Sequence, residues 1–467
     1  MAITCDLPPQ SPAIVALITN DVIGERMAGP GIRYWELARV LERHFTVKLI
    51  VPPHLSGESS VPRQDFPAAV HLCESARNLK ALTQTSDIII TLGDNLLLYP
   101  FLAQLGKYLV VDIYDPYLLS GLARDAQAQM SEQLNNHERY LNLLASQLRS
   151  GDFFVCAGEK QRDYWLGALS TAGRVNPYTY QQDPILRRLI DVVPFGLPTY
   201  PPKHTRPVLK GVYKSIAQDD KVLLWGGGIW NWFDAPTLIK AMPQILQRRS
   251  NVKLFFMGVK RPNSGARMSA VDEAIGLSKK LGLYDKAIFF NDWVPYNERQ
   301  NYLLEADIGV SLHLNHIETR FAFRTRLLDY LWAALPTVTT CGDVMSETLA
   351  HYQLARLINP GDVDGLVKAV LGLLDAPTLK KDLSAQFKKA AKAFSWETVA
   401  QPLVEFCAAP YYAPDRAYFQ QNQALSGAKR STPHWALKSW RVLREEGAFG
   451  LLKQGKEYLR WEKMMKS

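Results

Sequence analysis

Short apolar runs rich in β-branched residues recur along this chain, and segments with helical spacing separate them. In the first 200 residues the runs fall at residues 13–19, 46–51, 87–92, 108–113, 152–156 and 190–193. Later in the chain they fall at residues 222–225, 253–257, 287–290, 308–311, 337–339 and 355–358. Helical patterns lie between them, among them residues 34–43, 131–149, 235–248, 324–333 and 363–374. Apolar runs without polar alternation indicate strands buried on both faces, so the sequence predicts an α/β protein with parallel sheets.

A proline-rich segment divides the pattern into two halves. Five prolines lie between Pro194 and Pro207, too many for a helix or a central strand. We therefore predict two domains, residues 1–198 and 199–394, followed by a helix at 395–414 that crosses back to the first domain and a tail at 415–467. Because ligands of open α/β sheets bind beyond the carboxyl ends of the strands, we expect the site in a cleft between the domains.

The composition excludes several classes of protein. With 47% hydrophobic and 21% charged residues, the chain is neither disordered nor fibrous. Its five cysteines form no CxxC pair, which argues against a disulfide scaffold and a zinc ribbon and fits a reducing compartment. The N-terminus has no basic segment or cleavage site of a signal peptide, and no apolar stretch is long and uninterrupted enough to span a membrane. We therefore expect a cytoplasmic protein.

The positive charge is concentrated in the tail. Residues 429–467 hold ten Lys or Arg and four Glu, which leaves a net charge of only +3 on the other 428 residues. A nucleic-acid enzyme is expected to carry its excess charge on the folded body, so we expect no nucleic-acid partner. In residues 433–465 apolar and aromatic side chains alternate with basic ones. The tail therefore either lies on the inner face of the plasma membrane as a basic amphipathic helix or packs on the first domain.

Several segments, in order, resemble one known family. They are MAGPGIRYWELAR at 27–39, VVPFG at 192–196, LLWGGG at 223–228 with DAPTLIKAM at 234–242, FNDWVPYNER at 290–299, ADIGVSL at 306–312, LDYLWAALPTVTT at 328–340 and FSWE at 394–397. Together they resemble family 4 of the glycosyltransferases with the GT-B fold. The resemblance implies two Rossmann-like domains facing each other across a cleft. It also implies a nucleotide-diphosphate sugar as donor, retention at the anomeric carbon, and neither a metal nor an organic cofactor.

The chain departs from the family where the chemistry needs charge. The family's Arg and Lys in the donor loop align with Gly228 and Phe233. In its paired-Glu motif, the first Glu aligns with Phe321 and the second with Asp329.

Residues 316–329 offer a substitute for the lost charges. Arg324 and Arg326 stand near the start of a predicted helix, where guanidinium groups and the helix dipole neutralise a leaving diphosphate. The alternative is that one of them is structural, because residues i and i+2 do not share a helical face. Within the same segment we expect Asp329 to bind the ribose hydroxyls and Glu318 the sugar hydroxyls, with His316 as the alternative to Glu318. His313 ends a strand at the same edge.

Two loops of the first domain complete the expected site. Gly29 and Gly31 flank Pro30 before a helix, and their backbone N–H groups either face a phosphate or form a plain turn. Arg33 follows in the first helical turn and is expected to reach the cleft. Asp115, next to Tyr114 after a strand, is the expected polar group beside the acceptor, with loop structure as the alternative.

Further candidates lie in the second domain. The three consecutive glycines Gly226, Gly227 and Gly228 indicate close approach to the donor. After them, the aromatic cluster Trp230, Trp232 and Phe233 either lines the cleft or packs between the domains. By the resemblance, Trp293 and Val294 contact the base, and Lys260 with Arg261 adds positive potential.

One motif is discounted. Asp362 and Asp364 resemble a metal-binding DxD, but they stand where a helix begins, and an Asp N-cap needs no metal. By the resemblance we expect a glycosyltransferase of polysaccharide or glycolipid synthesis, and we leave open whether its acceptor is linked to a lipid. Two rival hypotheses remain, a nonenzymatic relative that binds a sugar or a partner protein, and a sugar-nucleotide epimerase.

Overall fold

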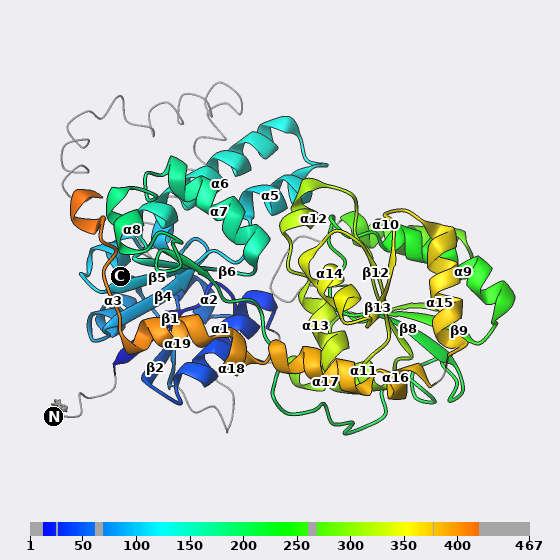
Figure 1. Cartoon of the computed structure of the whole chain (residues 1–467). Coiled ribbons are helices and arrows are strands. Elements are labelled where there is room, and N and C mark those ends of the chain that lie inside the picture. Colours follow the sequence, from blue (N-terminus) through cyan, green and yellow to red (C-terminus); the bar gives the residue numbers. More distant parts are fainter. Residues whose placement is uncertain (1–12, 25–26, 61–68, 260–268, 377, 420–467) are drawn as a thin grey trace.

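The computed structural model of this chain describes residues 13–24, 27–60, 69–259, 269–376 and 378–419. This part folds into two α/β domains that lie side by side, with the last helices running from the second domain back to the first (Figure 1). The prediction of two parallel-sheet domains is confirmed.

The first domain is built on a seven-stranded parallel sheet with the order β3-β2-β1-β4-β5-β6-β7. Its strands are β1 Ile14–Ile18, β2 Thr46–Val51, β3 Ala69–Leu72, β4 Ile88–Leu92, β5 Tyr108–Asp112, β6 Phe153–Cys156 and β7 Ile190–Val192. The central strands are wholly buried, as their continuous apolar runs predict. The sequence analysis missed β3 because this edge strand is short and partly exposed and has no apolar run.

The second domain holds a six-stranded parallel sheet with the order β10-β9-β8-β11-β12-β13. Its strands are β8 Lys221–Trp225, β9 Val252–Phe256, β10 Ile288–Phe290, β11 Ile308–Ser311, β12 Thr337–Thr340 and β13 Ala355–Ile358. All of these strands lie within a residue or two of their predicted positions. The neighbours of β8 are β9 and β11, so the strand order reverses at the carboxyl end of β8, which is a typical ligand position in open sheets.

Helices cover the sheets. In the first domain they are α1 Gly29–Leu41, α2 Pro53–Ser56, α3 Ala76–Gln84, α4 Asn95–Leu98, α5 Tyr117–Asp125, α6 Met130–Ser150, α7 Glu159–Thr171 and α8 Pro177–Gln182. In the second domain they are α9 Ala235–Arg248, α10 Ser269–Lys280, α11 Arg299–Glu305, α12 Ile317–Phe321, α13 Thr325–Trp332, α14 Val344–His351, α15 Val363–Leu374, α16 Leu379–Asp382 and α17 Ser384–Ala393. Two short 3-10 helices, Pro100–Gln104 and Tyr296–Glu298, complete the set among the described residues.

The proline-rich linker runs without a helix or strand between β7 and β8, as its composition predicts. Glu305 on α11 fixes its far end, because the carboxylate accepts hydrogen bonds from the backbone N–H groups of Val208, Leu209 and Lys210 at 2.9, 2.7 and 2.9 Å. Burial alone would raise the pKa of Glu305, but these bonds and the one to His204 lower it. The linker is therefore held against the second domain.

The chain returns to the first domain through α18 Trp396–Val399 and α19 Gln401–Ala408. Leu197 of the linker pairs with this segment through bonds to Phe394 and Trp396 of 2.7 and 2.9 Å. Further along, Asp415 forms a wholly buried ion pair with Arg174 at 2.8 Å. No described helix has both the length and the apolar character that crossing a membrane requires. The predicted tail, residues 415–467, is described only as far as residue 419, and its segment 433–465 lies outside the described residues.

Candidate active site

The two sheets face one another with the carboxyl ends of their strands. Gly158, which follows β6, lies against Val344, which follows β12. Helix α12 of the second domain packs on α5 and α7 of the first, where the side-chain amide of Gln161 donates to the carbonyl of Phe321 at 2.8 Å. Asn231 donates to the carbonyl of Arg124 at 3.0 Å across the same boundary. The carboxyl ends of the two sheets therefore meet at this boundary, where we expected the site.

The glycine loop at the carboxyl end of β8 is shaped by α13. The backbone N–H of Gly226 donates to the Tyr330 hydroxyl at 2.7 Å, and the carbonyl of Gly228 accepts from Arg326 at 2.7 Å. Gly227 between them has a φ of +79°, a left-handed conformation that favours glycine, and no atom of a neighbour lies where its side chain would point. A ligand can therefore approach the backbone closely at Gly227.

Arg326 is a buried cation without a carboxylate partner among the described residues. Its guanidinium lies 3.9 Å from the ring centroid of Phe233 and 4.7 Å from that of Trp225. One nitrogen donates to Gly228, whereas Nη1 is buried and makes no hydrogen bond. Burial lowers the pKa of Arg326 to about 9, since desolvation disfavours the charged form. A buried, incompletely paired guanidinium beside a glycine loop is suited to bind an anion.

Arg324 has different surroundings from Arg326, as in the alternative that one of the two arginines is structural. Arg324 is the N-cap residue of α13, and its two terminal nitrogens bind the two carboxylate oxygens of Glu318 at 3.0 and 2.6 Å. Both side chains are buried. The ion pair neutralises the charge of Arg324 and occupies both oxygens of Glu318, which we expected to bind sugar hydroxyls. Only the Nε of Arg324 remains buried without a partner.

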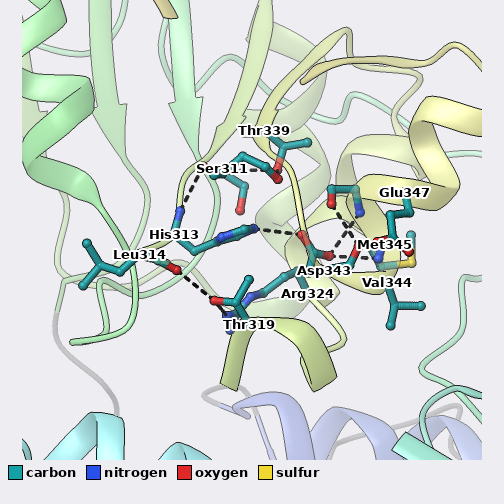
Figure 2. A network of polar contacts seen from close by, with 12 residues as sticks. Ser311, His313, Leu314, Thr319, Arg324, Thr339, Asp343, Val344, Met345 and Glu347 are labelled. Carbon is teal, nitrogen blue, oxygen red and sulfur yellow. Dashed lines mark hydrogen bonds and ion pairs between the residues drawn. The ribbon is translucent and has the colours of Figure 1, made fainter. Parts of the chain in front are cut away.

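Figure 2 shows the polar network behind this pair. His313, wholly buried after β11, lies with Nε2 2.9 Å from the carboxylate of Asp343, which also accepts from the backbone N–H groups of Met345 and Ser346 at the start of α14. Burial raises the pKa of Asp343, but the bond to His313 and the nearby charges outweigh it and lower the pKa. Sequence reasoning missed Asp343, although an Asp directly before a helix is a recognisable N-cap signal.

His316 stands at the start of α12, with Nδ1 3.8 Å from Glu318 and a side chain that is 26% exposed. Burial, ahead of the nearby charges, lowers its pKa, so the ring is neutral near pH 7. The structure therefore places His316 at the rim of the Glu318–Arg324 pair, where it remains a candidate for contact with the donor sugar.

Asp115 faces the second domain. Burial raises the pKa of its carboxyl to about 6, and the charge of Glu318 across the domain boundary adds to the effect. The hydroxyl of Ser120 and the charges of Arg124 and Arg324 act in the opposite direction. Asp115 therefore interacts electrostatically with Glu318 and Arg324 of the second domain. Its place beside the acceptor stays a prediction.

Arg33 does not reach the domain boundary, contrary to our expectation. It is wholly buried and forms an ion pair with Asp112 through Nε at 2.6 Å and Nη2 at 3.2 Å. Its other bonds go to the carbonyls of Val193 and Pro194, which begin the linker. The pair compensates two buried charges and ties α1, β5 and the linker together, so Arg33 has a structural role.

The loop before Arg33 also differs from its prediction. Helix α1 begins at Gly29, so Gly29 and Gly31 lie in its first turn instead of preceding it. The carboxylate of Asp21 accepts from the backbone N–H groups of Ala28 and Gly31 at 3.2 and 3.4 Å. A side chain at Gly31 would meet the carbonyl of Val22 at 2.5 Å. A carboxylate thus already occupies part of the helix end that we expected to bind phosphate, while Gly29 has open space beside Tyr114.

The remaining donor-side candidates that the structure describes are Trp293, Val294 and Asp329. Trp293 is half-buried and packs over Gly258, where a side chain would meet its ring at 2.9 Å, and Val294 is buried. Asp329, expected to bind ribose, forms an ion pair with Arg299 at 3.1 Å through one oxygen and keeps 31% of its side chain exposed. Lys260 and Arg261 lie outside the described residues.

The aromatic cluster after the glycine loop is partly exposed. Trp230 and Trp232 stack with ring centroids 5.7 Å apart, whereas Phe233 is buried beneath the two arginines.

At the discounted DxD motif, Asp362 caps α15 by accepting from the N–H of Gly365 at 2.8 Å, as predicted. Among the described residues, no group of three His, Cys, Asp or Glu side chains is arranged to hold a metal.

Comparisons with known proteins agree with this arrangement. Residues 220–376 match the family model of the group 1 glycosyl transferases. A comparison with curated proteins found no match.

Several solved structures are similar in fold. Sucrose-phosphate synthase from Thermosynechococcus elongatus has a TM-score of 0.61 and 16% identity, over 84% of this chain and 98% of that one. WaaG, a glycosyltransferase involved in lipopolysaccharide biosynthesis, has a TM-score of 0.58 and 16% identity, over 85% of this chain and 100% of its own. HepE from Anabaena, in complex with UDP-glucose, has a TM-score of 0.59 and 13% identity over 85% and 100%.

The different surroundings of the two arginines predict opposite effects on stability. Arg324→Met leaves the buried Glu318 carboxylate without its partner and should lower the free energy of unfolding by about 3–5 kcal/mol. Arg326→Met removes a buried charge that has no carboxylate partner, so the free energy of unfolding should stay unchanged or rise. Urea unfolding of both variants measures the difference. An equal loss in both would mean that Arg326 has a structural role like that of Arg324.

The raised pKa of Asp115 predicts a pH-dependent effect on stability. In the folded protein this carboxyl holds its proton up to about pH 6, whereas the unfolded chain releases it near its ordinary pKa of 3.8. The folded state therefore loses stability at this residue as the pH rises through that window. Asp115→Asn should stabilise the protein by about 1–2 kcal/mol at pH 8 and have little effect at pH 4. Unfolding measured at both pH values tests this, and an effect independent of pH would contradict the assignment.

Proposed function

We propose that this chain, whose residues 220–376 match the family model of the group 1 glycosyl transferases, transfers a sugar from a nucleotide-diphosphate sugar to an acceptor with retention at the anomeric carbon. The donor class is supported by the structural likeness to HepE, which was solved with UDP, with UDP and glucose, and with UDP-glucose. A uridine diphosphate sugar is therefore the first donor to test.

The observation that carries the proposal is the unpaired guanidinium of Arg326 beside the Gly226–Gly228 loop. A nucleotide-diphosphate leaving group gains negative charge as its bond to the sugar breaks. Charge-assisted hydrogen bonds from a buried arginine stabilise that charge more strongly than bonds in water do. The diphosphate in turn supplies the counter-charge that Arg326 lacks among the described residues. Arg326 thereby replaces the positive charge of the family's Arg and Lys, which align with Gly228 and Phe233 in this chain.

In the proposed reaction the bond between the anomeric carbon and the diphosphate oxygen breaks, and the acceptor oxygen bonds to that carbon on the same face. The acceptor proton passes to the departing phosphate oxygen, so the reaction needs no oxidant, cofactor or metal. The protein positions the two substrates and stabilises charge. We propose that Asp329 binds the ribose hydroxyls through the oxygen that does not bind Arg299. We also propose that Trp293 and Val294 contact the base, and that His316 and Asp115 contact the sugar and the acceptor.

We propose an acceptor of polysaccharide or glycolipid synthesis. The similar structure of WaaG belongs to a glycosyltransferase of lipopolysaccharide biosynthesis, which supports a lipid-linked acceptor. The alternation of basic and aromatic residues in 433–465 supports contact with the inner face of the plasma membrane. Flotation of the full chain with anionic liposomes, compared with a chain ending at residue 419, tests the membrane contact. Equal flotation of both would contradict it.

Arg326 should be essential for turnover. Arg326→Met removes the proposed diphosphate contact and should lower kcat by roughly 10²–10³-fold, as expected for the loss of one charged contact in the transition state. The matched control is Arg320→Met, which removes an exposed arginine of the neighbouring α12 and should keep nearly full activity. Release of the nucleoside diphosphate from UDP-, GDP- and ADP-sugars, with and without acceptor extracts, measures the rate.

The same assay distinguishes the other interpretations. Full activity of Arg326→Met would overturn the proposed role of this residue. Conversion of the sugar nucleotide without any acceptor would indicate an epimerase.

Turnover should persist in EDTA, because Arg326 and backbone N–H groups neutralise the diphosphate in place of a divalent cation. Loss of turnover on chelation, with recovery in manganese, would overturn the metal-independent mechanism.

A further inference from the structure

Tyr330, in the middle of α13, lies wholly buried between two strands of the second domain. Its hydroxyl accepts a hydrogen bond from the backbone N–H of Gly226 at 2.7 Å. The same hydroxyl lies 3.0 Å from the carbonyl of Leu224 on β8 and 2.9 Å from that of Val310 on β11. Since a phenol has one proton to donate and two lone pairs, it satisfies one N–H and shares its proton between two carbonyls. One side chain thus fixes the ends of two neighbouring strands and the start of the glycine loop.

The ring of Tyr330 requires space that only glycine provides. A side chain at Gly309 of β11 would lie 2.6 Å from the ring, and one at Gly226 would lie 3.1 Å from it. A real Cβ atom essentially never lies 2.6 Å from another side chain, and 3.1 Å is tighter than most real contacts, so the tyrosine and the two glycines pack as one unit. Because the ring cannot shift without displacing β11, the position of the hydroxyl under Gly226 is well defined.

Arg326 and Tyr330 are four residues apart and share one face of α13. Tyr330 binds the N–H of Gly226, at the start of the loop, and Arg326 binds the carbonyl of Gly228, at its end. The indole of Trp225 donates to the same carbonyl at 3.2 Å. Gly227 lies between the two fixed ends, in its left-handed conformation and with open space beside it. The two bonds therefore hold the loop in the form that leaves Gly227 accessible.

We propose that Tyr330 is a positioning residue, which holds the Gly226–Gly228 loop in the form that receives the diphosphate of the donor. The proposal rests on the proposed function, because it assigns the loop to the nucleoside diphosphate. Tyr330 touches no substrate itself and acts through the loop backbone. When the hydroxyl of Tyr330 is removed, the N–H of Gly226 loses its acceptor, and the loop adopts additional conformations that do not bind the diphosphate. The affinity for the diphosphate then falls by the fraction of time that the loop spends in those conformations.

The test uses Tyr330→Phe in the full chain, with UDP as the probe and calorimetry as the measurement. This variant keeps the ring and removes only the hydroxyl. We expect its Kd for UDP to rise about tenfold and KM for the donor sugar to rise with it, since one hydrogen bond no longer holds the loop. Two controls separate this effect from a general loss of stability.

Tyr34→Phe removes a buried hydroxyl that makes no hydrogen bond, and Tyr411→Phe removes a 2.8 Å bond to the carbonyl of Arg188, far from the loop. Both should bind UDP like the wild type, even if Tyr411→Phe is less stable. If Tyr330→Phe binds UDP as tightly as the wild type, the proposal is wrong. If the wild type binds none of UDP, GDP and ADP, the proposed function itself fails, which is a different result.

Hydrogen exchange of the wild-type chain gives a second measurement that needs no variant. The amide of Gly226 should be protected in the free protein, because it is bonded to Tyr330, and the amides of Gly227 and Gly228 should become protected only when UDP binds. Fast exchange at Gly226 in the free protein, or no change at Gly227 and Gly228 on binding, would overturn the proposal even if Tyr330→Phe does not fold.

Discussion

Arg326 carries a positive charge into the interior of the second domain, where the described residues offer it one carbonyl and two aromatic rings but no carboxylate. Burying such a charge is costly unless a counter-charge compensates it. The surrounding structure keeps the guanidinium in place: Phe233 and Trp225 support its face, and Gly228 fixes one nitrogen. In our account an anionic ligand supplies this counter-charge. Until that ligand binds, the buried charge of Arg326 lowers the stability of the folded protein.

The neighbouring Arg324 shows why position matters more than residue type. It stands two residues earlier, yet Glu318 binds both of its terminal nitrogens. Behind this pair, His313 and Asp343 connect β11 to the start of α14 (Figure 2). This network gives the carboxyl ends of the strands a fixed shape. Of the two arginines at the start of α13, it leaves Arg326 without a carboxylate partner among the described residues. Phe233, which aligns with a lysine in the family that the chain resembles, packs directly against Arg326. In our account Arg326 on α13 supplies the positive charge that the donor loop lacks.

Most of the fold could be predicted from the sequence because central strands of parallel sheets are buried on both faces and read as apolar runs. The edge strand β3 has no such run and was missed. The role of Arg33 could not be predicted, since its partner Asp112 lies 79 residues away and only the folded sheet brings them together. Likewise, no local pattern distinguishes Arg324 from Arg326. The role of Tyr330 could not be predicted either, because it depends on the glycine at 309 on a different element.

A structure of the full chain with a bound nucleoside diphosphate tests the central claim most directly. The account predicts a phosphate oxygen within about 3 Å of Arg326 Nη1, with Gly227 in van der Waals contact with the diphosphate and the Glu318–Arg324 pair intact. A diphosphate bound elsewhere, with Nη1 of Arg326 still without a partner, would contradict it.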